Sequence, residues 1–197
     1  MDVMASALGM DPVEFRLNNL ADARMRRVLE AAARKFKWTP KAAPSGRGVG
    51  VACGIDAGTY VASMAEVKVD KATGAVRVTR VVSAQDMGVL VNPEGALQQM
   101  EGCIMMGLGY ALTEEVRFKN GEVIDKNFDT YELPRISWLP KIEPLILASP
   151  DVPAQGGGEP AIITMGAVVA NAIHDAVGAR VLQLPMTPAR VKAAMKG

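Results

Sequence analysis

The first part of the chain carries apolar residues in a helical arrangement. Between Asp11 and Phe36, apolar side chains stand among many Arg and Glu residues. The apolar set is Phe15, Leu17, Leu20, Val28 and Leu29. Asp11 and Pro12 form the pair of N-cap and first-turn residues with which many helices begin. The pattern predicts one or two amphipathic helices, which form a helical arm over residues 1–40.

A breaker-rich stretch and a change of period follow this arm. Pro40, Pro44, Gly46 and Gly48 indicate a connector. From Val49 to Ala84 the pattern has a period of two, which is typical of strands. Val61, Ser63, Ala65, Val67 and Val69 alternate with Met64, Glu66 and Lys68, and Val76 and Val78 follow a turn at 70–74. We expect a hairpin with one buried face, inside a second domain over residues 47–197.

Glycine marks the next predicted helix. Asn92, Pro93 and Glu94 supply a capping side chain, a first-turn proline and an acid that suits the helix dipole. After them Gly95, Gly102 and Gly109 recur every seven residues. Each glycine costs a helix interior about 1 kcal/mol relative to alanine. The repeat therefore predicts a deeply placed helix that another backbone or a ligand approaches closely.

The remaining elements complete an α+β fold. Asn120-Gly121 is a favoured two-residue hairpin turn. Residues 130–141 form a proline-bearing loop, and residues 142–148 are predicted to be a strand. A second apolar helix follows Glu159-Pro160 and is closed by Gly178. We expect mixed or mainly antiparallel strands packed by two glycine-associated helices.

Composition narrows the classes of function. Apolar residues make up 49% of the 197, charged residues 22%, and the net charge is +1. These values suit a globular protein and disfavour nucleic acid as a partner. We find no stretch apolar enough to span a membrane and no signal peptide. Cys53 and Cys103 form no Cys-x-x-Cys pair, and His174 is the single histidine, so the chain alone offers no metal ligand set. A catalytic base would therefore be a carboxylate.

The segment Gly156-Gly157-Gly158-Glu159-Pro160 is the most distinctive candidate for chemistry. Glycines let a backbone approach another group closely, and Pro160 as first helical residue places Glu159 near the N-cap. Two other interpretations stay open at this point. Glu159 is a plain helix cap in one, and the glycines cradle a phosphate in the other.

Two further polar positions have similar alternatives. Gln98 and Gln99 lie in the glycine-striped helix, where a polar ligand or a neighbouring loop would satisfy their amides. His174 is interpreted as a packing or surface residue rather than a ligand.

Two motifs resemble those of a known family. The sequences QMEGCIMMGLGYALTEE and QGGGEPAIITMGAVVANAIHDAVG are similar to parts of the large, molybdenum-cofactor-binding subunit of the xanthine dehydrogenase and aldehyde oxidase family, and most of all to the isoquinoline 1-oxidoreductase type. The resemblance covers nearly the whole chain and suggests the C-terminal half of such a subunit. It implies that Glu159 is the base for a molybdenum-bound hydroxide. It also implies that Gln99, together with Gly157 and Gly158, contacts the cofactor.

The resemblance carries further implications for cofactors and partners. The cofactor would be molybdopterin, with its cytosine dinucleotide form as an alternative, and iron–sulfur clusters would lie on a small partner subunit. The substrate would be an aldehyde or an N-heteroaromatic compound. The rest of the large subunit would be a second partner, and we expect the cytoplasm, or the periplasm if a partner carries a leader. The alternatives are a non-catalytic assembly module and a small-molecule domain that binds anions at its helix tips.

Overall fold

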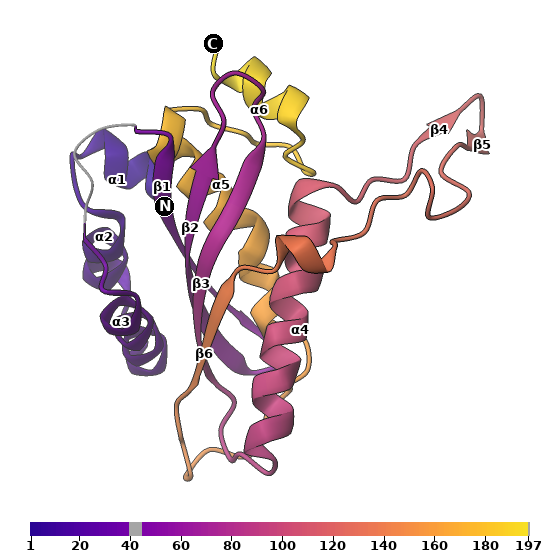
Figure 1. The fold of residues 1–197 in the computed structure, drawn as a ribbon. Helices are drawn as coiled ribbons and strands as arrows, with labels where there is room; N and C mark the ends of the chain where they lie inside the picture. Colours follow the sequence, from indigo (N-terminus) through magenta and orange to yellow (C-terminus); the bar gives the residue numbers. More distant parts are fainter. Residues whose placement is uncertain (40–44, 197) are drawn as a thin grey trace.

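A four-stranded sheet forms the centre of the molecule (Figure 1). The computed structural model describes residues 1–39 and 45–196. The strands β1 (Arg47–Asp56), β2 (Thr59–Val69) and β3 (Val76–Asp86) pair antiparallel in sequence order. The strand β6 (Lys141–Ile146) lies parallel to β3 at the edge. The predicted α+β class with mainly antiparallel strands is confirmed, and β6 begins one residue earlier and ends two earlier than predicted.

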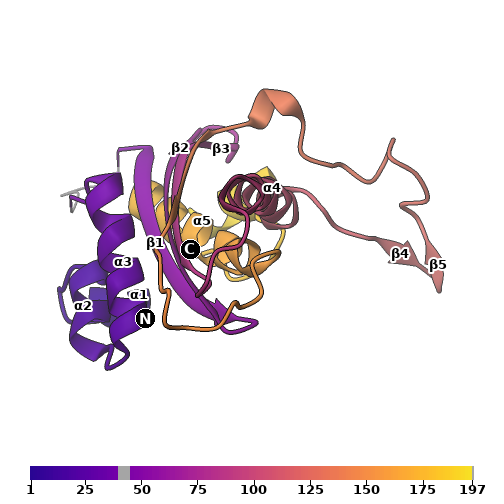
Figure 2. The same cartoon turned by 90° about the horizontal axis from the view of Figure 1, so that it is seen from below.

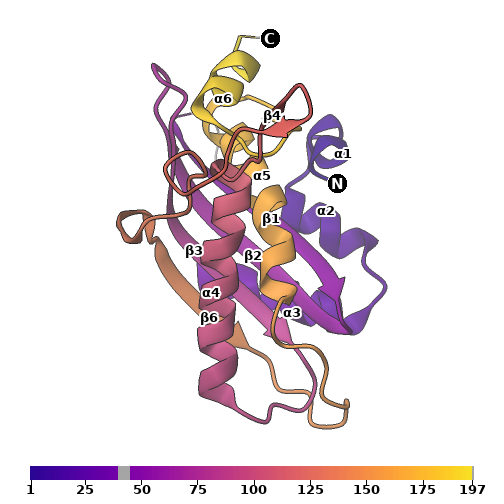
Figure 3. The same ribbon diagram turned by 90° about the vertical axis from the view of Figure 1, so that its right-hand side faces the viewer.

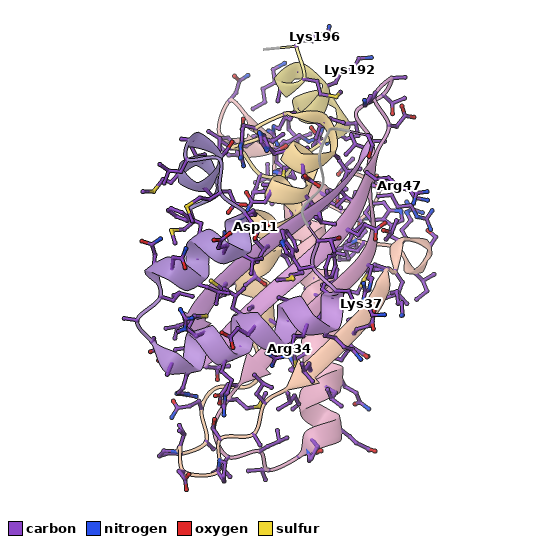
Figure 4. The ribbon with its side chains drawn as sticks, turned by 90° about the vertical axis from the view of Figure 1, so that its left-hand side faces the viewer. Asp11, Arg34, Lys37, Arg47, Lys192 and Lys196 are labelled. Carbon is purple, nitrogen blue, oxygen red and sulfur yellow. The ribbon has the colours of Figure 1, made fainter. Side chains whose placement is uncertain are left out.

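Three helices cover one face of this sheet (Figures 2 and 4). They are α1 (Asp2–Ala7), α2 (Pro12–Asn19) and α3 (Ala23–Phe36), and Asp11 and Asp22 cap the last two through their carboxylates. In Figure 4 the labelled charged side chains lie spread along the outside of the molecule from α2 to α6. The predicted connector residues Pro40 and Pro44 lie outside the described residues. The division into 1–40 and 47–197 stays a prediction.

The packing of α3 corrects one expectation. Val28 and Leu29 of α3 share a core with Met64 of β2 and Val82 of β3. The other side chains of β2, including Val61 and Ala65, are buried as well, under the opposite layer. Both faces of the hairpin are therefore buried over most of its length. The prediction of one buried face was wrong because the covering helix comes from a segment that sequence periodicity cannot place.

Two long helical segments cover the opposite face (Figure 3). They are α4 (Pro93–Leu112) and α5 (Met165–Val177), which follows the short 3₁₀ turn η2 (Pro160–Thr164). Asn92 caps α4 by accepting a hydrogen bond from the Gly95 N–H at 3.0 Å, and Gly178 ends α5 with φ at +76°. The start of α4 after Asn92 and the end of α5 at Gly178 are both as predicted. The helix α6 (Pro188–Ala194) lies next to the C-terminus, at the top of the molecule in Figure 1.

The segment Pro160–Val177 is apolar and long enough to cross a membrane by length and composition, with a mean hydropathy of 1.3. This differs from the expectation that no stretch approaches such a length. Half of the segment is buried inside the molecule, and its residues Val168, Ala172 and Ile173 belong to the core on the sheet. Apolar composition is what a core helix requires when it packs on a sheet.

The glycines of α4 do not behave as one stripe. Gly102 has nothing within 4 Å of the place where a side chain would begin, and Gly95 faces only its own cap, Asn92. Close approach occurs only in the second half of α4, at Gly107, where a Cβ would collide with the side chain of Met165 in α5, and at Gly109, where it would collide with the side chain of Glu114. The first half of α4 is accordingly more exposed than predicted, with Gln98, Gln99 and Gly102 open to solvent.

A long excursion joins α4 to β6. It contains the two-stranded β4 (Phe118–Lys119) and β5 (Glu122–Val123), then the 3₁₀ turn η1 (Ile136–Trp138). Asn120 and Gly121 both have positive φ, at 52° and 82°, as a two-residue hairpin turn of type I′ requires. The predicted turn is confirmed. Figures 1 and 2 show that this excursion projects away from the sheet and its helices.

Candidate functional site

The first half of α4 meets the glycine triplet at one carbonyl. The Gln99 Nε2 donates a hydrogen bond to the Gly158 oxygen at 2.9 Å, and the Cys103 Sγ donates to the same oxygen at 2.8 Å. Residues four apart lie on the same face of a helix, so both side chains reach the loop together. The structure thus brings Gln99, Gly158 and the adjacent Glu159 into one place.

The ends of the strands hold the same loop from its other side. The Gln155 N–H donates to the Met87 oxygen at 2.9 Å and the Gly156 N–H to the Ala57 oxygen at 3.1 Å. The Thr59 hydroxyl donates to the Gly156 oxygen at 2.7 Å. A Cβ on Gly157 would lie 2.9 Å from the Met87 sulfur. A Cβ on Gly156 would lie 2.5 Å from the Ala57 Cβ, so the loop runs close against the strand ends.

Glu159 presents its carboxylate to solvent. The residue precedes the 3₁₀ turn η2, and its side chain makes no capping hydrogen bond. Among residues 1–39 and 45–196 it forms no ion pair or side-chain hydrogen bond either. Glu159 is thus the N-cap residue and Pro160 the first helical residue, as predicted, but the first helical segment is the 3₁₀ turn η2 and the α-helix begins only at Met165. The cap interpretation loses its side-chain hydrogen bond. The carboxylate stands free beside Gly158, whose own flank is also open.

Cys103 is a residue of this place that the sequence analysis did not select. Burial raises the pKa of its thiol, and the negative charge of Glu159 raises it further. The thiol consequently stays protonated at neutral pH and acts as a donor to Gly158. Its spacing of four residues from Gln99 was a usable signal, because both residues had to share one helix face.

A buried polar group lies beneath the same place. Gln85 of β3 is fully buried, and neither polar atom of its amide has a hydrogen-bond partner in the described part of the chain. Its parallel partner Ile146 packs against Met100, Cys103 and Ala161, and paired residues share a sheet face. The amide is thus on the side of the sheet that faces α4 and η2.

Three hydroxyl groups fasten η2 to the sheet. The Thr164 hydroxyl donates to the Ser63 oxygen at 2.8 Å, and Ser63 and Ser83 are joined at 2.9 Å across β2 and β3. All three residues are buried, where an unmade hydrogen bond would cost about 1–3 kcal/mol. The chain of hydroxyls therefore fixes the turn that follows Glu159.

An acidic centre at the end of β3 fixes the segment that supports the loop. Asp86 is fully buried and pairs with Arg24 at 3.0 Å and Arg27 at 2.5 Å, both from α3. It also accepts hydrogen bonds from the Ser149 hydroxyl at 2.7 Å and the Gly88 N–H at 3.1 Å. Burial acts to raise the pKa of Asp86, but these donors hold it well below its usual range. These contacts tie the strand end beneath Gly157 to α3 and to Ser149.

The other predicted polar residues take no part in this arrangement. Gln98 is exposed and directs no hydrogen bond to the described residues. His174 lies on α5, where burial lowers its pKa and the positive charge of Arg180 lowers it further. It shares a surface hollow with Asp2 and Arg180, separate from the residues that surround Glu159. This agrees with its interpretation as a packing residue.

The family of the chain follows from comparison with known proteins. A family model described as a molybdopterin cofactor-binding domain matches residues 17–140. The chain belongs to this family. Similar proteins include one of the subunits of nicotinate dehydrogenase from Pseudomonas putida, 37% identical over the whole chain, and the beta chain of isoquinoline 1-oxidoreductase from Brevundimonas diminuta, 32% identical over 96% of it. The chain spans 18% and 24% of these two relatives.

Solved structures give the same result. The aldehyde oxidoreductase from Desulfovibrio gigas aligns with a TM-score of 0.64 and 32% identity over 71% of this chain and 16% of that one. The quinoline 2-oxidoreductase from Pseudomonas putida 86 aligns with a TM-score of 0.63 and 28% identity over 70% of this chain and 19% of that one. The resemblance to molybdenum hydroxylase large subunits, predicted from the motifs, is confirmed, and with it molybdopterin as the cofactor that the family binds.

The local chemistry fits such a cofactor. A pterin presents nitrogen and oxygen atoms that need hydrogen-bond partners, and the Gln99 amide and the backbone of Gly157 and Gly158 carry donors and acceptors at the surface. Gly102 and Gly158 leave open space where side chains would stand. No group of three or more His, Cys, Asp and Glu side chains that could hold a metal ion occurs within residues 1–39 and 45–196.

Proposed function

We propose that this chain is part of the large subunit of a molybdenum hydroxylase, in which Glu159 is the catalytic base. The enzyme would oxidise an aldehyde or an N-heteroaromatic carbon with oxygen derived from water. The observation that carries the proposal is the position of Glu159, a free carboxylate beside the Gly158 carbonyl that Gln99 and Cys103 both contact. Membership of the molybdopterin-binding family supports the chemistry.

Gln99, Gly157 and Gly158 would hold the pterin. When bound, the cofactor supplies an activated oxygen from water and accepts two electrons from the substrate. The chain's own contribution is proton transfer and orientation. The Glu159 carboxylate takes up a proton at one oxygen, a role that carboxylates perform well once a site excludes water. In the described chain Glu159 is exposed, so another polypeptide has to cover it.

The positioning of Glu159 rests on residues that do not touch the substrate. Gln99 and Cys103 fix the Gly158 carbonyl, and the Thr164 hydroxyl fixes the turn on the other side of Glu159. General-base contributions are about 10²–10⁴-fold and depend on placement within hydrogen-bond distance. Two anchors that flank one carboxylate therefore serve the geometry that a base requires.

The partners form part of the same proposal. Since the chain spans about a fifth to a quarter of the relatives named above, the remaining polypeptide of the large subunit would complete the cofactor site and shape the substrate pocket. A small iron–sulfur subunit would carry the electrons away. We place the assembled enzyme in the cytoplasm.

The test is a comparison of wild type and Glu159→Gln after co-expression with the remaining polypeptides of the operon. We expect equal molybdenum by elemental mass spectrometry in both complexes, and at least about 100-fold lower aldehyde or heterocycle oxidation in the variant. Glu94→Gln, a change of the same type at an exposed residue of α4, should keep wild-type activity. Molybdenum-free complexes would refute the proposal and favour a non-catalytic assembly module. Full activity in Glu159→Gln would refute the role of Glu159 as the base.

A further inference from the structure

The segment between α4 and β6 projects from the body and contains hydrogen bonds of its own. We call residues 113–140 the arm. The Arg117 side chain donates to Asp125 at 2.6 and 3.0 Å, and the Arg117 N–H donates to the same carboxylate at 2.6 Å. The Tyr131 hydroxyl donates to Glu114 at 2.7 Å. These bonds lie within the arm itself, and the ion pair between Glu115 and Arg190 of α6 at 2.7 Å ties its base to the body.

The arm exposes large apolar side chains that it does not bury on its own. Phe118 and Phe128 are each 74% exposed and Ile136 is 85% exposed. Val116, Val123, Ile124, Leu133 and Leu139 are also exposed. Monomeric proteins rarely expose so many neighbouring apolar residues, and such patches mark interaction sites. An internally bonded frame with outward apolar side chains is suited to insertion into another surface.

The base of the arm leaves room beside the helices. A cavity of about 410 Å³ lies between the arm and the body, and its apolar lining includes Leu108 of α4, Trp138 of the arm and Met186. Met106 of α4 is exposed as well. The arm and the cavity thus adjoin the C-terminal half of α4, the same helix that carries Gln99.

We propose that the arm is the docking element for the remaining polypeptide of the large subunit. Two observations identify the polypeptide that the arm binds. The chain spans only 18% and 24% of the relatives named above, and the arm leaves directly from the C-terminal end of α4, the helix that bears the candidate site. A polypeptide gripped by the arm would lie along α4 and cover Glu159. The proposal rests on the proposed function for the identity of this occupant.

The test measures assembly in the absence of molybdenum. The chain is mixed with the remaining polypeptide of the large subunit, and the dissociation constant is measured by biolayer interferometry for wild type and for Phe118→Ser combined with Phe128→Ser. Burial of a Phe side chain contributes to the binding free energy, and the loss of two such side chains should weaken binding by about 100-fold or more. The control, Lys119→Ser with Lys126→Ser, alters exposed polar positions of the same arm and should bind like wild type.

The outcomes separate the alternatives. Unchanged affinity in the Phe variant, or no binding by wild type, would overturn the proposal. The same holds if sedimentation shows that the wild-type chain forms a dimer which the Phe variant loses, because the arm would then bind a second copy. Equal melting temperatures of the isolated wild-type and variant chains exclude misfolding as the cause. Arm-dependent assembly in a complex that never takes up molybdenum would refute the proposed function and leave the arm's role intact.

Discussion

Gly102 stands in a helix interior where no contact within the chain requires glycine. No atom lies within 4 Å of its would-be Cβ, and the residue is exposed between Gln99 and Cys103 on α4. By contrast, a Cβ on Gly107 of the same helix would collide with the side chain of Met165. Glycine at position 102 therefore lowers helix stability with no packing benefit inside this chain, which is understandable if the benefit comes from a bound group.

We predict opposite effects of Gly102→Ala on the chain and on the assembled enzyme. In the isolated chain the free energy of unfolding should rise by up to about 1 kcal/mol, because alanine favours the helix. In the complex the molybdenum content should fall, since the methyl group would occupy space beside Gln99 where the proposed cofactor lies. Urea denaturation and elemental mass spectrometry measure the two effects. Full molybdenum loading in the variant would show that nothing approaches α4 at this point.

At the scale of elements, the contact between β1 and α5 depends on two glycines. A Cβ on Gly48 or Gly50 would collide with the backbone of α5 at Ala172 or Val168. The missing side chains let the helix lie directly on the strand, and Ala172 is completely buried there. Because α5 lies so close to the sheet, the preceding turn η2 is placed where the Thr164 hydroxyl can reach Ser63.

We therefore expect Gly50→Ala to destabilise the chain by about 1–3 kcal/mol, the usual range for overpacking. The clash is with backbone atoms, which cannot move aside as a flexible side chain can. The measurement is chemical denaturation of the isolated chain. Gly178→Ala is not a suitable control because Gly178 has a positive φ, whereas Gly102→Ala is suitable and should shift stability in the opposite direction. A variant as stable as wild type would mean that α5 is free to shift on β1.

The elements differ in how well the sequence predicts them. Caps and turns at Asp11, Asn92 and Asn120-Gly121 are local signals, and each stands where predicted. The pairing of β3 with β6 and the cover of α3 over Met64 involve residues far apart in sequence, so periodicity alone underestimated how much of the hairpin is buried.

The candidate site likewise combines residues that the sequence predicts with residues that it does not. Glu159, Gln99 and the two glycines were selected from sequence motifs, and the structure brings them together; their roles stay predictions. Cys103 and Gln85 belong to the same neighbourhood, but a lone cysteine and a glutamine in a strand carry no motif. Gln85 becomes visible only when β3 is placed beneath α4, whereas the position of Cys103 could have been inferred from its spacing of four residues from Gln99.

For the whole molecule, Asp86 connects the helical layer to the segment that leads to the glycine triplet. It joins α3, through Arg24 and Arg27, to the end of β3 and to Ser149 in the segment that leads to the glycine triplet. The helical layer and the candidate site are thus linked through one buried carboxylate. Removal of a charge from a buried pair is more costly than loss of a surface pair, because the partners remain desolvated.

This link predicts a pH-dependent stability difference between wild type and Asp86→Asn. Because the pKa of Asp86 is lowered in the folded chain, its stabilising effect is full above the unfolded value of about 4 and is lost as the pH falls below it. At pH 7 the variant should be less stable by about 2 kcal/mol, a value reduced because solvent screens the partly exposed arginines. The difference should shrink steadily from pH 4 downward in urea titrations. Asp151→Asn, at an exposed aspartate, should show no such trend, and a difference that persists unchanged at pH 2.5 would mean that the amide disturbs packing rather than charge.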